Sequence, residues 1–126
     1  LNDVSARDVQ TAHKQWYFGK SLDGFTPIGP CIVTADAFAD YPPRLGIRSF
    51  VNGEKRQDSN TALQIFDIDH VIAELSQGMT LKAGTIIATG TPAGVGMGMD
   101  PPQFLKPGDV VRCEIEGIGT LTNPVE

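Results

Sequence analysis

A helical repeat of apolar residues lies near the middle of the chain. Within residues 68–77, apolar residues recur at i, i+3, i+4 and i+7, the spacing that places them on one face of an α-helix. Asp67 precedes the repeat as a candidate N-cap, and Gly78 follows it where a left-handed C-terminal cap would lie. Residues 8–18 predict a second short helix that ends by Gly19.

Short apolar runs bounded by turn residues predict strands. The strongest signal is a hairpin that joins residues 45–51 to residues 54–58, because the intervening Asn52-Gly53 accepts the positive φ angles of a type I′ turn. The other predicted strands lie at residues 31–34, 85–88, 110–115 and 118–123. The first of these is expected to be buried, and the third to be buried on both faces because its polar residues alternate poorly.

The predicted elements define a chain of the α+β class that is mostly β, with two short helices. Its 126 residues and 40% apolar composition fit one domain over residues 1–126, without a linker or low-complexity segment. A domain of this length buries roughly two thirds of its unfolded surface, so a substantial core is expected.

The net charge of −5 argues against nucleic acid or an anionic membrane as a partner, because such binding needs a cationic patch. No apolar run reaches the roughly 20 residues that span a bilayer, and no signal peptide is recognisable, so a cytoplasmic protein is expected. Cys31 and Cys113 lack metal-ligand spacing and are expected to be buried free thiols. The chain begins Leu1-Asn2-Asp3 without a methionine, and we expect it to be a fragment.

The first candidate for chemistry is the segment of residues 2–10, which gathers two carboxylates, a guanidinium and two amides. A carboxylate at a strand end is a credible ligand for a hard cation such as Mg²⁺, and Asp3 has that position. The alternative is an ordinary helix start, with Asp3 or Ser5 as the cap and Arg7 paired with Asp8 or solvated.

Lys20, between Gly19 and a loop rich in Ser and Gly, is the second candidate. An ammonium held there could stabilise an enolate, whereas an ordinary surface lysine would do nothing. The third candidate is the glycine-rich segment of residues 88–98, whose backbone N–H groups could bind a carboxylate with help from the Thr91 hydroxyl. Its glycines miss the spacing of dinucleotide-binding and P-loop motifs.

Glu114 and Glu116 point to the same face of a predicted strand and could share a metal, or they form a solvent-facing pair. His13 and His70 have no partner at metal-ligand or triad spacing and are interpreted as structural.

The chain resembles the fumarylacetoacetate hydrolase family over essentially its whole length. Five segments occur in the order and at the spacing typical of that family, at residues 2–10, 19–21, 52–54, 84–96 and 105–111. The resemblance implies a mixed β-sandwich roll that forms a homodimer, with Mg²⁺, Mn²⁺ or Ca²⁺ held by three carboxylates.

The same resemblance implies roles for individual residues. Asp3 is expected to be one metal ligand, and Lys20 to face the substrate. Thr91 and the Gly90 backbone are expected to hold a substrate carboxylate, with the side chains of Arg7 and Gln10 lining the site. The metal would chelate a 2-oxo acid and act as a Lewis acid for its enolate.

In the family, the other two metal ligands form an acidic pair upstream of the segment that contains Asp3. Glu114 and Glu116 do not replace that pair, because the family has them as well, in its C-terminal stretch. We therefore expect weak metal binding and little activity from the chain alone, and a complete site in a longer or paired polypeptide.

The expected function is metal-dependent cleavage of a carbon-carbon bond in a small 2-oxo or β-diketo acid, of the acylpyruvate hydrolase or oxaloacetate decarboxylase type. One alternative is an isomerase or decarboxylase of unsaturated dioates from aromatic catabolism, of the 2-hydroxyhepta-2,4-diene-1,7-dioate isomerase type. The other is a metal-free, non-catalytic β domain, which would retain its function after Lys20→Ala or Thr91→Ala.

Overall fold

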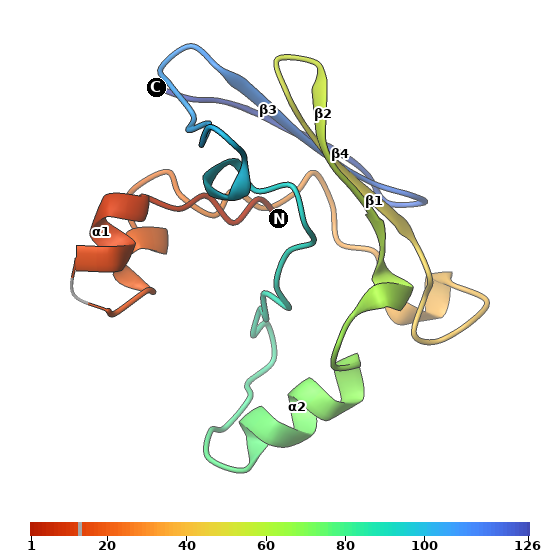
Figure 1. The fold of residues 1–126 in the computed structure, drawn as a ribbon. Helices are drawn as coiled ribbons and strands as arrows, with labels where there is room; N and C mark the ends of the chain where they lie inside the picture. Colours follow the sequence, from red (N-terminus) through yellow and green to blue (C-terminus); the bar gives the residue numbers. More distant parts are fainter. Residues whose placement is uncertain (13) are drawn as a thin grey trace.

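A four-stranded antiparallel sheet with strand order β2-β1-β3-β4 is the centre of the fold. The structure is a computed structural model that describes residues 1–12 and 14–126, so His13 lies outside the described residues (Figure 1). The strands are β1 (Gly46–Val51), β2 (Glu54–Asn60), β3 (Val110–Ile115) and β4 (Gly119–Pro124), and the α-helices are α1 (Arg7–Ala12) and α2 (Ile68–Ser76). Short 3-10 turns lie at η1 (Phe18–Lys20), η2 (Ala35–Ala37), η3 (Thr61–Leu63) and η4 (Gly96–Gly98). The prediction of a mostly β chain with two short helices is confirmed.

The predicted hairpin is confirmed as β1 and β2. Asn52 and Gly53 have φ angles of 52° and 85°, as a type I′ turn requires. Asn52 also connects this hairpin to β3, because its backbone N–H donates to the Val110 carbonyl and its Oδ1 accepts from the Val110 N–H, each at 2.9 Å. Its side-chain amide donates to Asp109 at 2.8 Å, and this bond, with one from the Lys106 backbone N–H, lowers the pKa of Asp109.

Helix α2 is confirmed, and its N-cap is as predicted. The Asp67 carboxylate accepts a hydrogen bond from the His70 N–H at 2.7 Å. The predicted left-handed cap at Gly78 is wrong, because Gly78 is not among the described glycines with a positive φ and the helix ends through Gln77 in right-handed geometry. Helix α1 ends at Ala12 rather than near residue 18, and Lys14, with a φ of 56°, is outside helical geometry.

Two predicted strands are absent from the described part of the chain. Residues 31–34 and 85–88 have no regular secondary structure, and neither segment pairs with a strand. Ile32 and Ile86 are 82% and 58% exposed, so the predicted burial of residues 31–34 is also wrong. An apolar run becomes a strand only where a neighbouring strand pairs with it through hydrogen bonds. The local sequence does not show which segment, if any, becomes that neighbour.

Both cysteines are free thiols, as predicted, but their burial differs. Cys31 is exposed, contrary to the expectation for its segment, and Cys113 on β3 is half-buried. Burial raises the pKa of the Cys113 thiol.

The chain buries much less surface than its length predicts. Its accessible surface is 9197 Å², whereas a compact monomer of this mass would expose about 6,500 Å². The chain therefore buries about half of its unfolded surface, not two thirds. Val111, 7% exposed, is the one buried hydrophobic residue among those described, and the rest of β3 is partly exposed, so its predicted burial on both faces is wrong. The reason is visible in Figure 1, where α1 and α2 both stand away from the sheet and neither covers it.

In the described residues, no helix is both long and apolar enough to cross a membrane.

Candidate active site

Lys20, Asp3 and Ser5 form a polar cluster at the N-terminal end of the chain. The Lys20 Nζ donates to the Asp3 carboxylate at 2.6 Å and to the Ser5 hydroxyl at 3.0 Å. An ammonium carries three N–H donors, so one donor of Lys20 has no partner among the described residues. The side chains of Lys20 and Asp3 are 29% and 33% exposed, which leaves the ammonium accessible to a small ligand.

Gly19 explains why Lys20 lies beside Asp3. Gly19 is buried against α1, and its carbonyl accepts a hydrogen bond from the Ala6 N–H at 2.8 Å. A Cβ at Gly19 would lie 2.8 Å from the backbone nitrogen of Gln10 and 2.9 Å from the carbonyl oxygen of Ala6. Only glycine permits this approach, and it fixes the position of η1, the turn that ends at Lys20.

Arg7 and Gln10 are bonded to each other on α1. The Arg7 guanidinium donates to the Gln10 side-chain oxygen at 2.8 Å, and Gln10 is only 5% exposed. Within the described part of the chain, neither side chain has a hydrogen bond to Asp3 or Lys20. The buried amide therefore orients the guanidinium, and the predicted site-lining role of both residues stays a prediction.

Thr91 lies on a second part of the candidate site, in the glycine-rich turn. Its hydroxyl oxygen accepts a hydrogen bond from the Gln57 amide of β2 at 2.8 Å, and the same amide donates to the Pro92 carbonyl at 2.8 Å. Gly90 has a φ of 103°, and a Cβ there would meet open space. The Thr91 hydroxyl is therefore exposed beside open space at Gly90, and the expected role of both residues in holding a substrate carboxylate stays a prediction. No hydrogen bond or ion pair between described residues joins Thr91 to Lys20.

The donor set does not form a divalent-cation site by itself. Across residues 1–12 and 14–126, no three His, Cys, Asp or Glu side chains are placed to hold a metal ion. Asp3 could supply one carboxylate oxygen, whereas Mg²⁺ or Ca²⁺ needs several oxygen ligands. The alternative pair is engaged elsewhere, since Glu114 lies 3.3 Å from the Arg112 guanidinium and Glu116 accepts from the Gly46 N–H at 2.9 Å.

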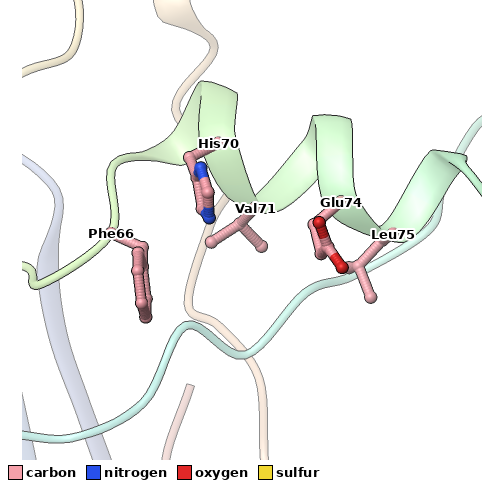
Figure 2. Close-up of a pocket in the computed structure, with 5 residues that line it drawn as sticks. All are labelled: Phe66, His70, Val71, Glu74 and Leu75. Atoms are coloured by element: carbon pink, nitrogen blue, oxygen red, sulfur yellow. The ribbon is translucent and has the colours of Figure 1, made fainter.

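A hollow of about 480 Å³ lies against α2, away from these residues. Figure 2 shows its lining, in which Phe66 and His70 stack with ring centroids 4.8 Å apart, and Val71, Glu74 and Leu75 complete the wall. None of the sequence-predicted site residues lines this hollow. Its wall is mainly the apolar face of one exposed helix, so the polar clusters are the better candidates for catalysis. The stacked ring of His70 fits a structural interpretation.

Sequence reasoning missed the contacts of two residues in these clusters. The sequence pattern indicates only a capping role for Ser5 and no role for Gln57. One available signal was the uniformly polar strand β2, whose seven residues include no apolar one. Such a strand stabilises its surroundings through side-chain hydrogen bonds rather than apolar packing.

Comparison with known proteins agrees with the resemblance found in the sequence. Residues 1–126 match the family described as "Fumarylacetoacetate (FAA) hydrolase C-terminal". The chain belongs to the fumarylacetoacetate hydrolase family. Oxaloacetate tautomerase YisK of Bacillus subtilis is 50% identical over 125 residues, which are 99% of this chain and 41% of that protein.

Two solved structures have the same fold over this length. The fumarylacetoacetate hydrolase of Exiguobacterium antarcticum is 55% identical with a TM-score of 0.93, over 98% of this chain and 44% of that one. A 5-carboxymethyl-2-hydroxymuconate delta-isomerase of Mycobacterium smegmatis is 46% identical with a TM-score of 0.83, over 97% of this chain and 44% of that one. This chain therefore spans about two fifths of the length of relatives that are named as enzymes.

The close approach of Gly19 to α1 gives a prediction. Gly19→Ala should lower the free energy of unfolding by about 1–3 kcal/mol, because the new methyl group meets backbone atoms that cannot move aside. The matched control is Gly78→Ala, where a Cβ meets nothing within 4 Å. Denaturant unfolding of both variants, made in the natural polypeptide that carries this chain, measures the difference. Equal stability of the two variants would contradict the account of Gly19.

Proposed function

We propose that the protein carrying this chain catalyses keto–enol tautomerisation of oxaloacetate or a closely similar 2-oxo dicarboxylic acid. The observation that carries the proposal is the Lys20 ammonium, which Asp3 and Ser5 hold and whose third N–H has no partner among the described residues. A fixed cation of this kind stabilises negative charge on an enolate oxygen. The printed name of the Bacillus subtilis relative, an oxaloacetate tautomerase, supports the choice of reaction.

The reaction moves one proton and no heavy atom. A base removes a proton from C3 of the keto acid, the electron pair forms the C2–C3 double bond, and the C2 oxygen becomes an oxyanion that then takes up a proton. The free N–H of Lys20 would donate to that oxyanion, so its stabilisation grows as charge develops. The Thr91 hydroxyl and the backbone of Gly90 would hold a carboxylate of the substrate.

Carbon-carbon cleavage is the second candidate, as expected from the sequence. Decarboxylation of oxaloacetate leaves the enolate of pyruvate, and hydrolysis of an acylpyruvate releases the same enolate, so the Lys20 cluster would serve either reaction. The name of the Mycobacterium smegmatis neighbour favours an isomerisation instead, which also passes through an enolate-like state. These reactions share the charge that Lys20 would stabilise and differ in the bond that breaks.

We also propose that Asp3 is one ligand of a Mg²⁺ or Mn²⁺ site whose other ligands lie outside these 126 residues. Two observations support this proposal. Asp3 is a carboxylate with an accessible side chain, and the described residues contain no group of three His, Cys, Asp or Glu side chains that could form a complete site. Oxygen ligands from carboxylates are those that hard divalent cations prefer.

A homodimer is the third proposal, and the exposed apolar surface supports it. The chain exposes about 2,700 Å² more than a compact monomer of its mass would. That surface includes the large apolar residues Trp16, Phe18, Ile32, Leu63, Ile65, Phe66, Met97 and Phe104. Isologous pairing is the commonest assembly of soluble proteins.

The proposed reaction is tested by following the enol absorbance of oxaloacetate with the natural polypeptide and Mg²⁺. Lys20→Met should lower kcat/KM by about 10²-fold or more, because a group that stabilises the oxyanion is lost. Lys82→Met, which removes an ammonium from an exposed turn, should leave kcat/KM unchanged. Enol interconversion no faster than in buffer would contradict the proposal, and release of pyruvate would favour the cleavage reaction.

The metal proposal is tested by calorimetric titration of Mn²⁺ into the same polypeptide. Asp3→Asn should weaken binding by roughly 10-fold or more, because an amide oxygen is a poorer ligand than a carboxylate. Asp8→Asn removes an equal charge from the exposed surface of α1 and serves as the control. Unchanged Mn²⁺ affinity in Asp3→Asn would show that Asp3 is not a ligand.

The assembly is tested by light scattering at micromolar concentration. Twice the mass of one polypeptide is the expected result, since the exposed apolar side chains are then covered by the second copy. The mass of a single polypeptide would contradict the dimer.

A further inference from the structure

The amide of Gln57 uses both its donor and its acceptor groups around the glycine-rich turn. Its Nε2 donates to the Thr91 hydroxyl oxygen and to the Pro92 carbonyl oxygen, each at 2.8 Å. Its Oε1 accepts a hydrogen bond from the Ser49 hydroxyl at 2.8 Å. Because the Pro92 carbonyl can only accept, the NH₂ group must face it, and the orientation of the amide is fixed.

That orientation determines the direction of the Thr91 hydroxyl proton. A hydroxyl has one proton to donate and accepts through its lone pairs. Since Oγ1 accepts from Gln57, the proton of Thr91 points away from the amide and is available to another acceptor. Thr91 is exposed, and the space beside Gly90 is open. An ionised carboxylate, which only accepts hydrogen bonds, is the complementary ligand.

The backbone around Gln57 brings its amide within hydrogen-bond distance of Thr91. Ser49 and Gln57 are partners in the register of β1 and β2, so their side chains lie on the same face of the hairpin. A Cβ at Gly94 would lie 3.1 Å from the Gln57 Cγ and would also meet the backbone carbonyl of Arg56. The turn therefore reaches β2 because residue 94 has no side chain, and this approach puts Thr91 within reach of the Gln57 amide.

We infer that Gln57 is a positioning residue that holds the Thr91 hydroxyl as a hydrogen-bond donor for a substrate carboxylate. The inference rests on the proposed function in one respect, the binding of a carboxylate at Thr91. Gln57 acts through Thr91 and does not itself contact the substrate.

Oxalate, a stable dicarboxylate, is the probe, and its affinity for the natural polypeptide is measured by calorimetry. Gln57→Glu should weaken binding by about 10-fold or more, because the new carboxylate accepts the Thr91 proton that the ligand would otherwise accept. Gln57→Met should weaken it by only about 3-fold, because the hydroxyl is then free to rotate but is not turned away. Equal losses from the two variants would contradict a role in directing the Thr91 proton.

The matched control is Gln64, whose Nε2 donates to the Thr89 hydroxyl at 3.1 Å. Gln64→Glu changes the same kind of contact two residues earlier in the same segment, and oxalate affinity should change by less than about 2-fold. An equal loss from Gln64→Glu and Gln57→Glu would indicate a general charge effect and would overturn the inference.

A double-mutant cycle separates a role through Thr91 from any other role. Thr91→Val alone should weaken oxalate binding about as much as Gln57→Glu, and adding either Gln57 variant to Thr91→Val should cause no further loss. Losses that add would overturn the inference. If Gln57→Glu fails to fold, as judged by thermal melting, the cycle with Gln57→Met carries the same test.

The outcomes also separate this inference from the proposed reaction. A wild-type protein that binds oxalate through Thr91 and Gln57 but does not interconvert the tautomers of oxaloacetate would retain the inference and refute the proposed function. Normal catalysis by the wild-type protein, together with unchanged oxalate affinity in Gln57→Glu, would support the proposed function and refute the inference. A wild-type protein that does not bind oxalate at all would overturn the inference.

Discussion

The pairing of β1 with β3 is the contact on which the rest of the structure depends. It joins residues 47–51 to residues 111–115 in antiparallel register, across the whole middle of the chain. Asn52 closes the end of this ladder with its hydrogen bonds to Asp109 and Val110. The intervening segment, which contains α2 and the glycine-rich turn, is thereby held as a long loop with both ends fixed. Thr91 owes its position to that closure and to the Gln57 amide on the neighbouring strand.

The sheet supports the candidate site without forming a core around it. Apart from Val111, the large apolar side chains of the described residues retain some exposure to solvent. The stability of the folded chain must then come largely from hydrogen bonds between strands, from side-chain hydrogen bonds and ion pairs, and from apolar surface that other protein covers. The candidate functional groups are likewise not joined to each other. Lys20 and Thr91 belong to separate parts of the chain, and no hydrogen bond between described residues connects them.

The elements that were predicted correctly are those whose signals are local. Asn52-Gly53 fixed a turn through backbone preferences, and Asp67 fixed a helix start through a bond that spans three residues. The wrong predictions depended on distant partners. Residues 31–34 and 85–88 have the composition of strands, but no strand in the described part of the chain pairs with them. Gly78 does not adopt a positive φ, although its position after a helix predicted one.

The sequence by itself determined the family, the hairpin, the helix α2 and the residue types of the site, because motifs, turns and caps depend on neighbours in the chain. Only the tertiary structure decided which polar groups meet. The bond between Lys20 and Asp3 crosses seventeen positions, and that between Gln57 and Thr91 crosses thirty-four. Each depends on a glycine that admits a close backbone approach, Gly19 in one case and Gly94 in the other. A sequence shows that such a glycine is present, but only the folded chain shows which backbone it approaches.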